Sequence, residues 1–225
     1  MHCKPLSQIL DEVVTAMRDK GTFNSIVKSL TGSIYTLTFA KAVKNTYIDD
    51  LIIITSVTNG TQTIKVKTIT TDNKSVTFEY LGQLTNENGT FENKMPIFEY
   101  EFFDVEANFL NSKNVSNLKF EKYPLIFFLY DFDEKREEEF RFVNFKIYII
   151  DKTEASTLIP IRDETTFIKL RNIYYLFLEK LKNSKYVTQI TTHNYKELPY
   201  RDNKLNVVID AIELTFNNLQ LNYCN

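Results

Sequence analysis

Apolar side chains recur at helical spacing near the start of the chain, and they form one stripe that consists of Leu6, Ile9, Leu10, Val13, Val14 and Met17. Pro5 suits the beginning of such a helix, and Gly21 suits its end. The pattern predicts an amphipathic helix that docks one face on a larger body.

A β-rich block follows, from about residue 34 to residue 103. Ile64 and Val66 alternate with polar residues, and Asn59-Gly60 is a strong two-residue hairpin signal. Residues 71–74 indicate another turn, after which the alternation resumes at Val76 and Phe78. Short strands with tight turns over this length predict a small, mostly antiparallel barrel or sandwich.

Three lysines on this block allow two interpretations. Lys65, Lys67 and Lys74 are either the basic face of a nucleic-acid-binding barrel or a solvated outer face. We favour the solvated face, because no aromatic side chain for base stacking lies among them.

The last hundred residues alternate between apolar strands and one long helix. A strand at 123–130 precedes an acidic turn at 131–139, and a second strand covers 140–150. Asp163 is the expected cap of a helix that runs to about Asn183. Two closing strands are expected at 186–192 and 206–216.

These elements together predict an α+β fold. In it, a mostly antiparallel sheet packs on the N-terminal helix and on one long helix, with an inserted small β-barrel or sandwich. We expect residues 1–33 and 104–225 to form the core domain and residues 34–103 to form the inserted β subdomain.

Composition narrows the function classes. The 225 residues carry a net charge of about −2, which is not the basic footprint of a protein that neutralises phosphates. Cys3 and Cys224 have no partner at a metal-binding or disulfide-framework spacing, so we expect free thiols and no cofactor. The first ten residues lack the apolar core of a signal peptide, and no window has the length of a membrane span, so we expect folding in a cytoplasm without membrane contact.

The acidic turn is the one candidate site, and its residues are Asp131, Asp133, Glu134, Lys135, Arg136, Glu137, Glu138 and Glu139. It is interpreted as a solvated hairpin, as an interface or channel-facing loop, or as a metal site. The metal site is disfavoured because the segment lacks the Asp/Asn/Gly pattern of a calcium loop and contains two basic residues.

Catalytic motifs give little support for an enzyme. His2 and His193 are the two histidines, and neither lies at ligand spacing from another His, Cys or carboxylate motif. No nucleophile elbow and no phosphate-binding glycine loop occurs. A Ser/His/Asp triad needs no sequence adjacency, so a hydrolase stays an alternative, with His193 as its testable residue.

The order of elements resembles that of the neck and tail-connector proteins of tailed bacteriophages. The resemblance rests on four stretches, which are Pro5–Leu10, Tyr123–Leu129 with the acidic hairpin after it, Arg171–Glu179 leading to Tyr186, and the closing segment Leu205–Leu221. The Asn-, Lys-, Ile- and Phe-rich composition is similar to that of AT-rich phages, including the crAss-like phages. The β insertion departs from the minimal connector.

This resemblance implies a structural, non-enzymatic virion protein assembled in the host cytoplasm. The implied role is a homo-oligomeric ring, such as a tail terminator, that joins portal-side and tail-side rings around passing double-stranded DNA. An acidic hairpin facing the lumen of that ring is expected to repel DNA and keep it from sticking. The alternative is a binding module that uses the small β-barrel to contact nucleic acid or protein.

Overall fold

The computed structural model describes residues 4–30, 32–101, 124–137, 140–154, 159–202 and 207–222. The chain forms two compact units, one of residues 18–95 and the other of residues 1–17 together with 96–225. These bounds differ from the expected insertion at 34–103. The first barrel strand begins before residue 34. The strand at 97–101 belongs to the larger unit, where it pairs with the strand that begins at Leu125.

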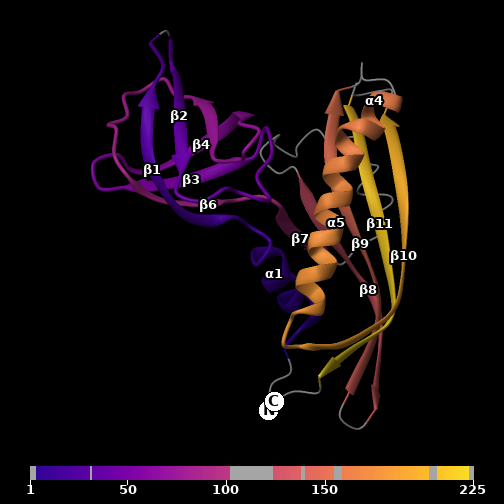
Figure 1. Ribbon diagram of the computed structural model, residues 1–225. Coiled ribbons are helices and arrows are strands. Elements are labelled where there is room, and N and C mark those ends of the chain that lie inside the picture. Colours follow the sequence, from indigo (N-terminus) through magenta and orange to yellow (C-terminus); the bar gives the residue numbers. More distant parts are fainter. Residues whose placement is uncertain are drawn as a thin grey trace. The chain divides into compact units, whose positions relative to one another are not determined.

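The smaller unit is a closed, antiparallel barrel in the order β1-β2-β5-β4-β3-β6, with β6 pairing back onto β1 (Figure 1). Its strands are β1 (Lys20–Lys28), β2 (Ile34–Phe39), β3 (Leu51–Ser56), β4 (Gly60–Ile69), β5 (Ser75–Glu79) and β6 (Gly89–Asn93). The predicted small β-barrel is therefore confirmed as a barrel, and Gly21 lies in β1 and does not terminate a helix.

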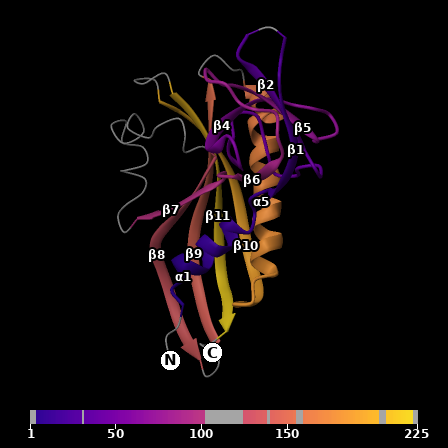
Figure 2. The same ribbon diagram turned by 90° about the vertical axis from the view of Figure 1, so that its left-hand side faces the viewer.

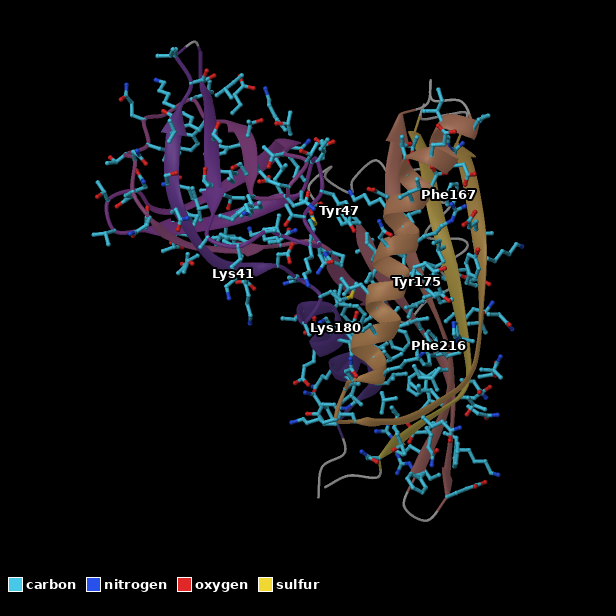
Figure 3. All side chains as sticks on the ribbon, viewed as in Figure 1. Lys41, Tyr47, Phe167, Tyr175, Lys180 and Phe216 are labelled. Atoms are coloured by element: carbon cyan, nitrogen blue, oxygen red, sulfur yellow. The ribbon has the colours of Figure 1, made fainter. Side chains whose placement is uncertain are left out.

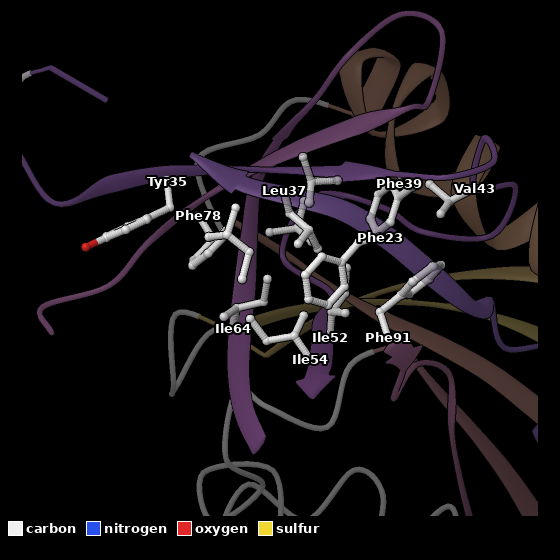
Figure 4. Close-up of a cluster of buried hydrophobic side chains, with 13 residues drawn as sticks. Phe23, Tyr35, Leu37, Phe39, Val43, Ile52, Ile54, Ile64, Phe78 and Phe91 are labelled. Atoms are coloured by element: carbon white, nitrogen blue, oxygen red, sulfur yellow. The ribbon is translucent and has the colours of Figure 1, made fainter. Parts of the chain in front are cut away.

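Alternation along the strands builds the barrel core, because successive side chains of a strand point to opposite faces. Figure 4 shows large apolar side chains from different strands meeting inside the barrel. The ring centroids of Phe39 and Phe91 lie 4.5 Å apart, and those of Tyr35 and Phe78 lie 5.7 Å apart. The barrel thus has a filled interior of its own.

The β3–β4 turn has a different length from the predicted two-residue hairpin. Ser56 pairs with Gly60, so three residues lie between the paired positions, and Gly60 has a φ of 63°. A three-residue loop closed by a residue with positive φ is a common hairpin type. Glu87 accepts hydrogen bonds from the backbone amides of Thr58 and Asn59, which fixes this turn on the loop before β6.

The larger unit contains a five-stranded sheet in the order β10-β11-β9-β8-β7. Its strands are β7 (Ile97–Glu101), β8 (Leu125–Glu137), β9 (Phe140–Glu154), β10 (Val187–Asp202) and β11 (Val207–Asn222). All neighbouring pairs are antiparallel except β7 and β8, which are parallel. The α+β class with a mostly antiparallel sheet is confirmed.

Three described helices belong to this unit, namely α1 (Leu6–Thr15), α4 (Ile159–Glu164) and α5 (Thr166–Lys182). Figures 1 and 2 show α5 lying along one face of the sheet. Phe177 of α5 contacts Phe216 of β11, and Phe216 stacks on Phe145 of β9 at 4.7 Å. Phe216, labelled beside α5 in Figure 3, is fully buried.

The start of the long helix differs from the prediction. The residue before α5 is Thr165, whose hydroxyl donates to the carbonyl of Ile161 in α4. Asp163 lies within α4 and pairs with Arg171, with 2.7 Å between Oδ1 and Nη2. The expected Asp163 cap is therefore wrong, because an arginine two turns further along the chain holds that carboxylate.

Candidate functional site

The acidic segment is strand and not turn over the residues that the structure describes. Strand β8 continues through Glu137, and its ladder with β9 runs from Asp133↔Asn144 to Glu137↔Phe140 after an irregularity near residue 131. The predicted turn is wrong for residues 131–137, where Glu134 pairs with Arg141 of β9 and with Arg136 of its own strand, so that the charges are compensated within a paired hairpin. Glu138, Glu139 and the side chain of Asp131 lie outside the described part.

Glu134 is the centre of this compensation. Its carboxylate accepts from Nη2 of Arg141 at 2.6 Å and from Nε of Arg136 at 2.8 Å. The hydrogen bond from Arg141 is the main reason that the pKa of Glu134 lies below its usual range, while burial acts in the opposite direction. The side chains of Glu134 and Arg141 are 15% and 6% exposed, so this pair is shielded from solvent.

Arg141 also links the hairpin to the chain before α1, because its Nη1 donates to the backbone carbonyl of Lys4 at 3.0 Å. Sequence reasoning did not identify Arg141, although a basic residue just after an acidic segment is the signal that could have found it. The Glu134–Arg141 pair therefore fixes the N-terminal segment on the sheet.

The remaining described members of the segment lie at the surface. Lys135 pairs with Glu137, and Asp133 is exposed. Across the described residues, no group of three or more His, Cys, Asp or Glu side chains is placed to hold a metal ion. The described part of this region is a charged hairpin surface that its own ion pairs partly neutralise.

A second candidate surface surrounds His193 on β10, which the sequence reasoning took for a simple surface residue. His193 is half-buried, and its Nε2 lies 2.8 Å from the hydroxyl of Tyr174 on α5. Burial, followed by the nearby charge of Lys182, holds the pKa of His193 below its ordinary value. Tyr195 stacks on Tyr174 with ring centroids 5.4 Å apart.

This cluster leaves aromatic surface exposed beside the edge of the sheet. Tyr195 is 51% exposed and Tyr175, labelled in Figure 3, is 64% exposed. The sequence signal was two tyrosines on a helix and a His-x-Tyr pair on a strand. Only the packing of α5 on β10 brings those two patterns together.

Two of the three barrel lysines pair with acidic neighbours. Lys65 pairs with Asp49 at 2.8 Å, and Lys67 pairs with Glu79. Ion-paired lysines provide little of the free positive charge that phosphate binding needs. These contacts favour the solvated-face interpretation over the nucleic-acid interpretation.

One end of the barrel carries three exposed aliphatic side chains on three different loops. Leu30 lies between β1 and β2, Val57 between β3 and β4, and Leu81 between β5 and β6, and each is at least 95% exposed. The antiparallel order of the barrel brings these three loops to the same end. We call this surface the aliphatic end of the barrel.

Comparison with known proteins identifies no relative, since no family model, no curated protein and no solved structure matches the chain. Of the helices that the structure describes, none combines the length and the apolar character needed to cross a membrane.

Proposed function

We propose that the protein is a structural subunit of a ring in the neck or tail of a tailed phage, between portal-side and tail-side rings and around the path of double-stranded DNA. The observation that carries the proposal is the five-stranded sheet, which ends in two different edge strands, β7 and β10, among the described strands. A subunit with two different edges can join identical copies head to tail, and such contacts form a ring when the rotation from copy to copy closes. The resemblance of the element order to phage connectors supports the same role.

In this proposal, the segment 131–139 faces the channel or a neighbouring subunit. Asp133 is exposed there, and negative charge on a channel wall repels DNA. Glu134 contributes less to this repulsion than its sequence position suggests, because Arg136 and Arg141 neutralise it. A density map of the assembled ring tests this placement, and Asp133 on the outer rim would refute it.

The assembly state of the purified full chain tests the ring itself. Light scattering after size-exclusion chromatography should give one discrete mass that is a multiple of 26.4 kDa, and negative-stain images should show closed rings. A chain that stays monomeric at every concentration up to its solubility limit contradicts the proposal.

A second candidate function is a protein-binding module, and the aliphatic end of the barrel favours it. Apolar side chains exposed together mark interaction sites, and these three loops contain no lysine or arginine that would attract phosphate. A photo-crosslinker in place of Val57 should capture a protein in infected cells, whereas the same group in place of Ile48, in the loop at the opposite end, should not. Binding of single-stranded DNA with a steep salt dependence would favour the nucleic-acid alternative.

A further inference from the structure

Among the described strands, β7 and β10 are the two edges of the main sheet, and they carry complementary residues at matching levels. The register of the ladders defines rows that cross all five strands. One row runs Tyr195, Leu214, Ile147, Phe128 and Tyr100, from β10 to β7. Its two ends are tyrosines that are 51% and 49% exposed.

The neighbouring row has opposite charges at its ends. It runs Lys196, Glu213, Tyr148, Phe127 and Glu99, so a basic residue stands on the β10 edge and an acidic residue stands on the β7 edge. These two positions share the other face of the sheet, because adjacent residues of a strand alternate between faces. Lys196 is exposed.

A third row ends in two apolar residues. It runs Leu198, Ala211, Ile150, Leu125 and Ile97, and it lies on the same face as the charged row. Both end residues are partly buried against the apolar cluster on that face. The three rows therefore end in an aromatic pair, a charge pair and an aliphatic pair.

The directions of the edge strands also match. Strand β7 is parallel to β8 and β11, and β10 is antiparallel to β11, so β7 and β10 run in opposite directions. A rotation about an axis along the strands preserves these directions from copy to copy. The β10 edge of one copy then meets the β7 edge of the next in the antiparallel sense, which is the more stable pairing.

We propose, on the basis of the ring function above, that β10 of one copy pairs antiparallel with β7 of the next copy and continues the sheet around the ring. When the rows continue without a shift, Tyr195 lies opposite Tyr100, Lys196 opposite Glu99, and Leu198 opposite Ile97. Aromatic, opposite-charge and apolar cross-strand pairs all stabilise antiparallel strands.

A two-fold contact between identical edges is less favourable for β7. Pairing β7 with itself in its central registers places Glu99 opposite Glu99 or Glu101, and like charges directly opposite each other destabilise a ladder. The contact of β10 in one copy with β7 in the next, which we call the joint, avoids this repulsion and places Lys196 opposite Glu99.

Cysteine pairing tests the joint in the full chain. In a background with Cys3→Ser and Cys224→Ser, the double variant Lys196→Cys/Glu99→Cys should form a ladder of covalent oligomers on mild oxidation. Residues directly opposite each other have Cβ atoms about 4.5–5.5 Å apart, close to disulfide range. The matched control Thr192→Cys/Glu99→Cys, displaced along the same face, should not crosslink.

Charge exchange provides a second measurement on the same joint. Lys196→Glu and Glu99→Lys should each weaken assembly by roughly fivefold per joint, and the double exchange Lys196→Glu/Glu99→Lys should restore it. The subunit concentration at half-assembly, measured by sedimentation velocity, reports this effect.

The outcomes separate the joint from the ring. Rings that form but give no crosslink in the double variant and no charge-exchange rescue overturn the joint while leaving the ring function intact. Covalent dimers from Lys196→Cys alone, with nothing larger, also overturn it in favour of a two-fold contact. A wild-type chain that never assembles refutes the ring function, and the joint is refuted together with it.

Discussion

A buried ion pair between α4 and β11 provides a sharp test of how the helical layer is held on the sheet. Asp210 is fully buried, and its carboxylate accepts from Arg162 and from the hydroxyl of Thr153 at 2.8 Å. Arg162 is 5% exposed. Replacing Arg162 alone leaves the buried carboxylate of Asp210 without the guanidinium that compensates its charge.

The expected magnitude follows from that burial. Arg162→Met alone should destabilise the larger unit by about 3–5 kcal/mol, because it leaves the carboxylate of Asp210 buried without a compensating charge, and Asp210→Leu alone should also destabilise it through loss of the ion pair. The double variant Arg162→Met/Asp210→Leu should lie within about 1 kcal/mol of the wild type, since apolar residues of similar size replace a buried pair at little net change. Lys65→Met breaks an exposed pair, 57% and 70% exposed, and should change stability by about 0–1 kcal/mol.

Hydrogen exchange measured by mass spectrometry is the suitable assay, because a chain with two compact units need not unfold in one step. Peptides from α5, β9 and β11 report the larger unit, and peptides from the barrel serve as an internal control. A loss of less than about 1 kcal/mol of protection in each single variant would refute the role of the buried pair, and so would a loss in the double variant that equals the sum of the two single losses.

Three further predictions concern titration and close backbone packing. Glu134→Gln should reduce the loss of stability at acidic pH. A carboxylate with a lowered pKa stabilises the fold above pH 4.5 and loses that contribution as the pH falls below 4.5. Thermal melts of both proteins at about pH 6 and about pH 3.5 measure the difference. His193→Gln should remove a stability loss that the wild type shows as pH falls below 6.5, since the fold favours the neutral ring; equal pH profiles for both proteins would contradict this. Gly89→Ala should destabilise the barrel far more than Gly60→Ala, because its new methyl group would lie 2.3 Å from the carbonyl oxygen of Thr55. At Gly60 the methyl group meets open space, and the positive φ alone costs about 1–2 kcal/mol. Similar urea midpoints for the two variants would contradict this prediction.

The sequence by itself determined the features that depend on neighbouring residues. Alternation with a period of two predicted the barrel strands around Ile64 and Val76, and helical spacing predicted the apolar stripe that α5 buries at Phe167, Leu170 and Phe177. Turn chemistry placed the hairpin at Asn59-Gly60, although its exact length depended on contacts with Glu87.

Only the tertiary structure decided which distant segments meet. The strand at 97–101 looked like part of the β-rich block, but it pairs with β8, because parallel strands need a long connection that local patterns do not reveal. Residues of the acidic segment lie in a strand, where Glu134 accepts a hydrogen bond from Arg141 of the neighbouring strand. His193 contacts the hydroxyl of Tyr174, which lies on α5 nineteen residues earlier in the chain. Ladder register and helix packing set these contacts, and both depend on burial summed over the whole sheet, which a short window of sequence cannot contain.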